Sequence, residues 1–579
     1  MAISSGDVRL RDFFGWAGPI LGPDSAFFRL MVVYGIGIGL LSLATPISVQ
    51  MLINSVANTA LPAPLFTLAA VLLVLLLISA LLGAFRTHLM EMFRRRFFAR
   101  LVAETTLRAV HAQNPFFHDE RRGDLFNRYF DVMTVQKAIP SLLIGGFTII
   151  LQATVGFIVT AFYHPFFLAF NLGFIFAVWL IWRLWSRGAM RTAVALSQRK
   201  YEAAHWLESV GGSNGFYKSS RHLDFAMDRS EDVTAAYVKG HAAHFRCTFP
   251  QSVALLMLYA FASAGLLALG GWLVIQGQLS IGQLVAAELI LSSIFYGAAQ
   301  LGPYLDSFYD LVAGVEELSQ ILAIPQEQIP EPKAQPPRPV HGALALSSVR
   351  VRLGNEQAQL AFGIPAGSRL VACAAPGMDR LLSGLLKRHI KPDSGIITLG
   401  GADITALDTY QLRSDVIVLD RPTIVESSIR DYLALACAGQ EPTQTMDALR
   451  LVGLDQRIAM LADGMDTRLS STGWPLTLVE MMQLKLASAV LAEPRILVLS
   501  ALYDMVPADR MQAVFAALAG KPITILYFSG RPHDISLDGW FWLGRDSQRI
   551  MTDRAQFDRV RLGGDRPADD QEASDALPL

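Results

Sequence analysis

Long apolar runs dominate the first half of the chain, and polar links or charged segments separate them. A helix needs about 20 mainly apolar residues to cross a bilayer, and six runs reach that length. They lie at Phe27–Leu52, Leu65–Phe85, Ile139–Tyr163, Pro165–Trp185, Pro250–Ile275 and Ile281–Tyr304. The pattern predicts a membrane domain of six helices over residues 27–324. Residues 1–26 mix Arg with Phe and Trp, which suits either a helix at the membrane surface or a mobile terminus.

Basic residues are confined to alternate connections between these runs. Ile53–Pro64, His164 and Gln276–Ser280 carry no Lys or Arg, whereas Arg86–Pro140 and Arg183–Arg246 carry ten each. Lys and Arg favour the cytosolic ends of membrane spans. Both long segments and both chain termini are therefore predicted to lie in the cytoplasm, with the chain in a bacterial inner membrane.

The long basic segments have the pattern of helices rather than loops. In Arg86–Ala112, the side chains of Met90, Phe93, Phe97 and Leu101 recur at helical spacing. The helix is expected to end before Pro115, because the residue before a proline disfavours the α conformation. The spans are thus predicted to continue into the cytoplasm as long helices.

A Pro-rich stretch over residues 325–342 predicts a linker to a second domain. Beyond it, short strand and helix patterns alternate over residues 343–561, which predicts an α/β domain. The polar residues 562–579 are expected to form a disordered tail.

One stretch organises this second domain. Gly367–Gly395 has the pattern of a strand (Arg369–Ala374), a tight loop containing Pro376-Gly377, and an amphipathic helix. The helix is expected to bury four leucines: Leu381, Leu382, Leu385 and Leu386.

Composition agrees with a membrane protein. Hydrophobic residues make up 52% of the 579 residues, and the mean hydropathy is +0.37. A net charge of −1 provides no basic surface for nucleic acid.

Cys247, Cys373 and Cys437 lack metal-ligand spacing. His241 and His244 have no Cys or carboxylate cluster nearby in sequence, so a solvated helix face explains them better than a metal site.

Three stretches together resemble the ATP-binding cassette (ABC) exporter family. NPFFHDERRGDLFNRY (114–129) is similar to its first intracellular turn, GQLSIGQLVAAELIL (277–291) to the approach to its sixth span, and Gly367–Gly395 to the strand, phosphate loop and helix of its nucleotide-binding domain. The resemblance implies a half-transporter of the type I secretion kind, with an α-helical membrane domain followed by an α/β P-loop-NTPase-like domain. It also implies a homodimer or a pairing with a second half-transporter, and peptide, protein or lipid cargo.

The phosphate loop departs from the family pattern. A P-loop uses glycines to aim backbone N–H groups at phosphate, a Lys for the phosphates and a Ser/Thr hydroxyl for Mg²⁺. Counted forward from the strand, Arg380 stands at the Lys position, and counted back from the end of the helix, Asp379 does. The loop is one residue short, no hydroxyl follows either residue, and Pro376 beside Gly377 has no N–H to donate.

Other residue types also stand where the resemblance implies the rest of an ATP site. These are Leu353 for the adenine-stacking aromatic, Asp420 for the Gln, Thr477 and Glu480 within LTLVE for the signature LSGGQ, Ser500 and Ala501 for the Asp and Glu after a strand, and Ser529 for the His. The departures predict a degenerate site without ATPase activity, catalytic residues, metal or cofactor, leaving only weak nucleotide binding open.

Three functional hypotheses follow. The chain is the non-hydrolysing half of a transport or secretion complex that includes other envelope proteins, or an ATP-independent scaffold or regulator, or a transporter driven by something other than ATP. Glu288 in the sixth span is a candidate pathway residue, because a charge that faces lipid is costly. The alternative to the whole resemblance is an unrelated α/β domain.

Overall fold

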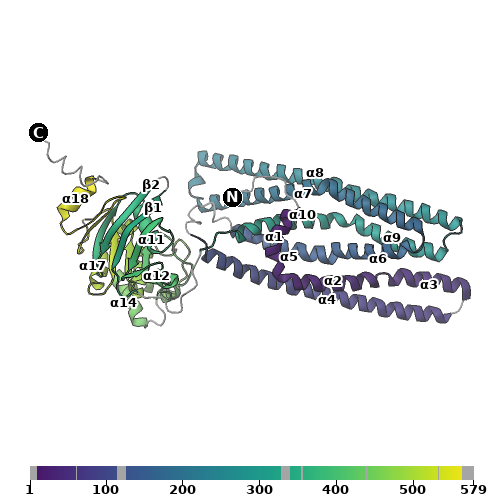
Figure 1. The fold of residues 1–579 in the computed structure, drawn as a ribbon, viewed down its shortest axis with the longest axis horizontal. Helices are drawn as coiled ribbons and strands as arrows, with labels where there is room; N and C mark the ends of the chain where they lie inside the picture. Colours follow the sequence, from purple (N-terminus) through teal and green to yellow (C-terminus); the bar gives the residue numbers. More distant parts are fainter. Residues whose placement is uncertain are drawn as a thin grey trace. The chain divides into compact units, whose positions relative to one another are not determined.

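The chain forms two compact units, Met1–Glu327 and Gln328–Leu579. The computed structural model describes residues 10–59, 62–113, 126–327, 339–353, 356–436, 441–532 and 534–563. Cys437 and most of the predicted intracellular turn (114–129), linker and tail lie outside the described residues. Figure 1 labels the helices and strands of each unit.

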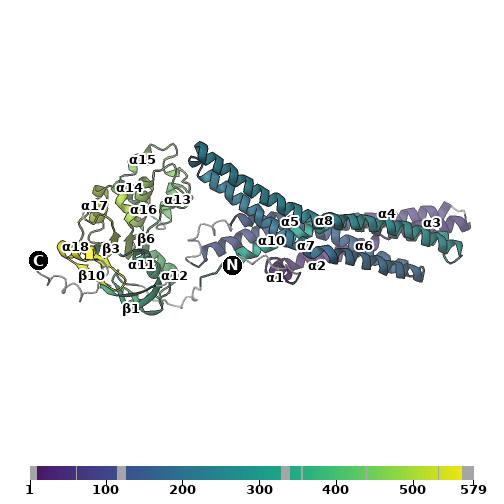
Figure 2. The same cartoon turned by 90° about the horizontal axis from the view of Figure 1, so that it is seen from above.

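Helices make up almost all of the first unit that the structure describes. They are α1 (Leu10–Leu21), η1 (Gly22–Asp24), α2 (Ser25–Leu41), α3 (Ala44–Thr59), α4 (Pro62–Val110), α5 (Asp131–Ser141), the π-helix η4 (Leu142–Gly146), α6 (Phe147–Ala161), α7 (Pro165–Gly212), η5 (Phe216–Lys218), α8 (Ser220–Ile275), α9 (Ile281–Ala299) and α10 (Leu301–Leu322). Within the described residues, six helical stretches are long and apolar enough to cross a membrane, which confirms the predicted number. The predicted long helices are also confirmed, because α4, α7 and α8 are continuous and α7 runs beside α8 (Figures 1 and 2).

Two predicted spans are broken where a proline follows. The first span stops as α2 at Leu41 and resumes as α3 at Ala44, where the N–H of Ile47 bonds the carbonyl of Leu43 at 3.1 Å. The sixth stops as α9 at Ala299 and resumes as α10 at Leu301. Pro46 and Pro303 cannot donate the backbone hydrogen bonds that would continue each helix across the break.

The core of the first unit joins α1 and α10 to the middle of α4. Met90, Phe93, Phe97 and Leu101 are all at most 2% exposed, which confirms the face predicted from their spacing. The described part of the N-terminal segment is helical, and α1 packs on α10 with the rings of Phe13 and Phe308 5.6 Å apart.

Two sheets build the second unit. The antiparallel sheet has the order β2-β1-β4-β5, formed by β1 (Leu344–Leu353), β2 (Glu356–Ile364), β4 (Ser394–Leu399) and β5 (Ala402–Asp403). The second sheet has the order β10-β9-β3-β8-β7-β6, formed by β3 (Arg369–Ala374), β6 (Val416–Leu419), β7 (Ile496–Leu499), β8 (Thr524–Phe528), β9 (Gly539–Leu543) and β10 (Gln548–Met551). Its strands pair in parallel from β9 to β6, and β10 pairs antiparallel at the edge.

Helices complete two hydrophobic cores. The remaining elements are α11 (Met378–Leu386), α12 (Thr409–Asp415), α13 (Ile429–Ala434), α14 (Pro442–Val452), α15 (Asp455–Ala459), η6 (Gly464–Asp466), α16 (Leu478–Ala492), η7 (Ala501–Met505), α17 (Ala508–Ala517) and α18 (Arg554–Gly563). One core joins the antiparallel sheet, the parallel sheet and α11, whose four predicted leucines are all buried. The other joins the parallel sheet to α14, α16 and α17. The predicted fold class, an α-helical membrane-type domain followed by an α/β domain, is confirmed.

Candidate nucleotide site

Most of the positions singled out in the sequence meet at one edge of the parallel sheet. Strands that run in parallel end at the same edge, and open α/β sheets bind ligands outside these carboxyl ends. The positions follow four of the parallel strands: Gly377, Asp379 and Arg380 follow β3, Asp420 follows β6, Ser500 and Ala501 follow β7, and Ser529 follows β8. The fold therefore brings together seven residues that lie up to 152 positions apart (529 minus 377) in the chain.

The loop after β3 is a tight turn. The N–H of Ala375 bonds the carbonyl of Leu543 at 2.9 Å, which ties the loop to the end of β9. Gly377, the residue just before α11, has φ +84°, a left-handed conformation that favours glycine. The N–H of Leu381 then bonds the carbonyl of Gly377 at 3.0 Å. Three residues, 375–377, link β3 to α11.

Asp379 and Arg380 both belong to the first turn of α11. The Asp379 side chain is half-buried, and Arg380 is exposed. The positive end of a helix dipole favours an anion at such a terminus. An anionic ligand there would be attracted by the N-terminus of α11 and by Arg380, and repelled by the carboxylate of Asp379.

Asp504 in η7 is a residue of this edge that the sequence reasoning missed. Its carboxylate accepts a hydrogen bond from the Ser529 hydroxyl at 2.8 Å, another from the Gly530 N–H at 2.8 Å, and a third from the Tyr527 hydroxyl. Burial, together with the charge and hydrogen bond of Asp504, raises the pKa of Tyr527. Asp504 thus joins the segment after β7 to the segment after β8. The signal available in the sequence was a carboxylate five residues beyond the end of β7.

Two lysines lie close enough to Asp420 to interact with its charge. Burial lowers the pKa of Lys387, the residue that follows α11, and of Lys485 on α16, and the Asp420 carboxylate opposes the shift in both. Lys485 also donates to the carbonyl of Arg421 at 2.6 Å and to that of Thr423 at 3.0 Å. Lys485 therefore holds the loop after β6 in place.

Ser500 and Ala501 differ in their surroundings. The N–H of Ser500 bonds the carbonyl of Leu419 at 3.1 Å, which joins the ends of β7 and β6. Its hydroxyl oxygen is buried and has no hydrogen-bond partner among the described residues. Ala501 is exposed. A buried, unpartnered hydroxyl at a sheet edge is available to a ligand or a water molecule.

Thr477 and Glu480 have a structural role at the start of α16. The Thr477 hydroxyl accepts from the Glu480 N–H at 3.3 Å, and the Glu480 carboxylate accepts from the Thr477 N–H at 2.8 Å. This reciprocal pair is a capping box. Arg457 also donates to Glu480 at 3.0 Å. Leu353 ends β1 in the antiparallel sheet, so it belongs to a different sheet from the other positions.

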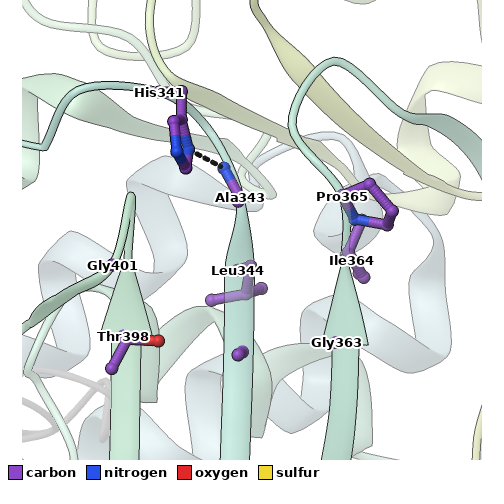
Figure 3. A pocket seen from close by; sticks show the side chains of 9 residues that line it. His341, Ala343, Leu344, Gly363, Ile364, Pro365, Thr398 and Gly401 are labelled. Carbon is purple, nitrogen blue, oxygen red and sulfur yellow. Dashed lines mark hydrogen bonds between the residues drawn. The ribbon is translucent and has the colours of Figure 1, made fainter.

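A shallow, mostly apolar hollow with a volume of about 370 Å³ lies on the antiparallel sheet, among β1, β2 and β4. Figure 3 shows His341 above it, with its Nδ1 accepting from the Ala343 N–H at 3.3 Å, and Pro365 and Thr398 at its sides. None of the positions predicted from the sequence lines this hollow.

In the first unit, Glu288 lies half-buried on α9. One carboxylate oxygen accepts from the Ser292 hydroxyl at 3.0 Å, and the other is buried without a partner among the described residues. His241 is exposed, and His244 bonds the Thr192 hydroxyl at 2.9 Å through Nδ1. The two histidines therefore have different environments on α8.

A membrane-type domain of six apolar helices followed by this α/β domain is the fold of an ABC exporter, and the chain is a multi-pass membrane protein. Residues 28–212 match the family model described as the ABC transporter transmembrane region. The chain is 23% identical over 501 residues to the leukotoxin translocation ATP-binding protein LktB of Mannheimia glucosida, covering 84% of this chain and 69% of the relative. LktB of Bibersteinia trehalosi gives the same identity and coverage.

The fold of the whole chain also matches a solved structure. A bacterial Atm1-family ABC exporter with ATP bound superposes with a TM-score of 0.77 at 17% sequence identity, covering 96% of this chain and 99% of that one. The match with LktB extends over 501 residues, more than the first unit contains, so it includes the α/β domain.

The prediction that this chain is not an ATPase is contradicted by these comparisons. The relatives that match across both domains are named as ATP-binding translocation proteins. The prediction compared side chains with a motif, whereas phosphate is bound largely by backbone N–H groups and helix N-termini. The strand, turn and helix that present such groups are retained here as β3, the loop and α11.

Proposed function

We propose that the chain is one half of a dimeric ABC exporter of the bacterial inner membrane, with both termini in the cytoplasm, driven by ATP at its nucleotide-binding domains. The observation that supports this proposal most is the match to ATP-binding translocation proteins across both domains. One sheet edge brings together Arg380, Asp420, Ser500 and Ser529. This arrangement supports a ligand site at that edge. Because LktB is named for translocation of leukotoxin, we propose protein cargo.

A nucleotide-binding experiment tests whether ATP binds at this edge. The full-length protein in lipid nanodiscs is titrated with a fluorescent ATP analogue. Arg380→Ala is expected to weaken binding about tenfold, which corresponds to losing about 1.4 kcal/mol of a charge-assisted contact. Asp379→Asn is expected to strengthen binding, because it removes a negative charge from the same helical turn.

A matched control is Arg450→Ala on α14, an exposed arginine paired with Asp447 in the same helix. Its binding curve should equal that of the wild type. A wild-type protein that gives no saturable signal at millimolar analogue, or shifts of the same sign in Arg380→Ala and Asp379→Asn, would overturn a nucleotide site at this edge.

The partner is tested separately. The chain is isolated from its native membranes in mild detergent, and the proteins recovered with it are identified by mass spectrometry. Recovery of a second half-transporter in equal amount assigns a heterodimer. Recovery of a cross-linked dimer of this chain alone assigns a homodimer. Recovery of the monomer alone contradicts the proposal.

We also propose that Glu288 contributes to the pathway through the membrane domain. Its second carboxylate oxygen is buried and unpartnered among the described residues, although α9 is one of the six candidate spans. A carboxylate in such a position costs free energy unless water or a polar cargo group reaches it. We expect α9 to present this carboxylate to an aqueous cavity.

A further inference from the structure

A cluster of charged side chains lies where α5, α7 and α10 meet. We call it the seam cluster, and its members are Arg128, Asp131, Lys200, Glu316 and Glu317. The carboxylates are nearly inaccessible: Asp131 and Glu316 are 3% exposed, and Glu317 is 0% exposed. Buried charges are normally paired, so the balance of charge here needs an explanation.

The pairings leave one negative charge over. Arg128 forms an ion pair with Glu317, and Lys200 forms one with Asp131 at 2.9 Å. Tyr201 donates a second hydrogen bond to Asp131 at 2.7 Å. Among the described residues, Glu316 has a neutral partner, the amide of Gln320 at 2.7 Å, and no ion pair. Within that part of the chain, three buried carboxylates therefore face two cations.

Two carboxylate oxygens are also unused. Oε2 of Glu316 and Oε1 of Glu317 are buried, and neither has a hydrogen-bond partner among the described residues. They belong to consecutive residues of α10, and both side chains interact with the charges of Arg128 and Asp131. A proton on either residue would neutralise the excess charge and turn an unused acceptor into a donor.

We infer that Glu316 and Glu317 share one proton and form a protonation site that closes the seam between α5, α7 and α10. Loss of this proton leaves two buried carboxylates on consecutive residues of α10, with one arginine, Arg128, interacting with both. Like charges so placed repel each other and cannot be hydrated while the seam is closed. Deprotonation therefore favours separation of α10 from α5 and α7. This inference does not depend on nucleotide binding.

Both glutamates have a raised pKa, as a carboxyl group that keeps a proton requires. Burial raises the pKa of Glu317 to about 7, although Arg128 opposes the shift, and burial raises the pKa of Glu316 as well. Both residues lie on α10, which is not one of the six candidate spans. A carboxyl group with a raised pKa keeps its proton in the folded state after the unfolded chain has lost it. Stability therefore falls as the pH rises from the ordinary value of 4.5 towards about 7.

Other groups around the pair do not change this sign. From α7, the buried Ser197 hydroxyl interacts with Glu317 and lowers its pKa, which opposes the effect of burial without cancelling it, and Lys200 and Tyr201 are held by Asp131. From α4, Arg108 donates to the carbonyl of Leu322 at the end of α10. On α10 itself, Asp306 and Asp310 interact with His244 from α8, and Asp310 also interacts with the charges of Lys200 and Asp131. These groups remain in every variant below, so their own titration cancels in the comparison.

The test measures thermal unfolding of the full-length protein in nanodiscs between pH 5.5 and pH 8.5. In the wild type, the unfolding constant should rise with pH by up to about tenfold per unit, the limit for one proton. Glu316→Gln keeps the Arg128–Glu317 ion pair and mimics the protonated state. It should reduce this rise, because the charge of Glu316 no longer adds to the effect of burial in raising the pKa of Glu317, and it should unfold at a higher temperature than the wild type at pH 8.5.

The control is Glu202→Gln on α7, which removes an exposed carboxylate paired with Arg199 in the same helix. It should keep the wild-type pH dependence. Equal slopes for the wild type and Glu316→Gln, or an equal loss of slope in Glu202→Gln, would overturn the inference.

Infrared difference spectroscopy detects the protonated carboxyl group directly, and a change in packing alone would not alter this signal. The wild type at pH 5.5 should show a protonated-carboxyl band that weakens by pH 8.5. The weakening should be smaller in Glu316→Gln and in Glu317→Gln. If Glu316→Gln does not fold, Glu317→Gln serves for both measurements. A carboxyl band that changes equally in the wild type and the folded variant would contradict a shared proton.

Discussion

Asp24 and Arg100, 76 positions apart in the chain, form an ion pair with 2.9 Å between Oδ2 and Nη2. The Asp24 carboxylate is fully buried, and Arg96 approaches its other oxygen at 3.3 Å. Arg100 also donates to the carbonyl of Ile20 at 2.5 Å. Two arginines of α4 thus hold the corner between α1 and α2.

Asp24→Asn is expected to loosen this corner. Breaking a buried ion pair costs about 3–5 kcal/mol, because the remaining charge stays uncompensated. Arg100 keeps some exposure and a second partner in Glu104, so we expect about 3 kcal/mol, the lower end of that range. Thermal unfolding in nanodiscs measures the loss. Arg95→Ala on α4, whose side chain is 79% exposed, should change stability by less than about 1 kcal/mol.

Gly145 lies in the π-helix against Tyr304 of α10. A Cβ atom at Gly145 would lie 2.1 Å from a ring carbon of Tyr304, whereas one at Gly146 would meet no atom closer than 3.6 Å. Gly145→Ala must displace the ring and should cost about 1–3 kcal/mol, the range for overpacking a core. Gly146→Ala is the matched control and should be nearly neutral. Comparable losses for the two alanine variants in an unfolding experiment would contradict the packing.

Asp504→Asn is expected to weaken the link between β7 and β8. Hydrogen bonds to a charged group contribute about 1.5–3 kcal/mol, and the asparagine keeps only part of the acceptor capacity that Tyr527, Ser529 and Gly530 use. A loss of about 3 kcal/mol should appear in denaturant unfolding of the full-length protein. Asp509→Asn, a 76% exposed carboxylate on the next helix, should leave the midpoint unchanged. Unchanged stability in Asp504→Asn would show that the three contacts do not support the edge.

Sequence patterns predicted the elements of this fold much better than the contacts between distant elements. The bounds of β3 and the buried leucines of α11 follow from local periodicity, and both are confirmed. The role of Asp504 depends on donors from β8, more than 20 positions away, and no local pattern places them together. The breaks after Leu41 and Ala299 could have been predicted, because Pro46 and Pro303 were present in the sequence.

The error about ATPase activity has a related cause. Counting residues against a motif showed that Asp379 or Arg380 stands where the family has Lys, but it could not show what the folded edge presents to a ligand. The structure adds the N-terminus of α11, the buried hydroxyl of Ser500 and the lysines near Asp420. Side-chain identity alone therefore did not describe what this edge presents to a ligand.

The proposed aqueous environment of Glu288 leads to a prediction about chemical accessibility. A thiol reacts with maleimide through its thiolate, which forms readily in water and poorly in lipid. In a background with the three native cysteines replaced by serine, Glu288→Cys should react with a membrane-impermeant maleimide in proteoliposomes. Val71→Cys on α4, in the most apolar candidate span, is the control and should stay unlabelled. Labelling of the Val71→Cys variant at the same rate, or protection of Glu288→Cys in the folded protein, would place Glu288 away from a pathway.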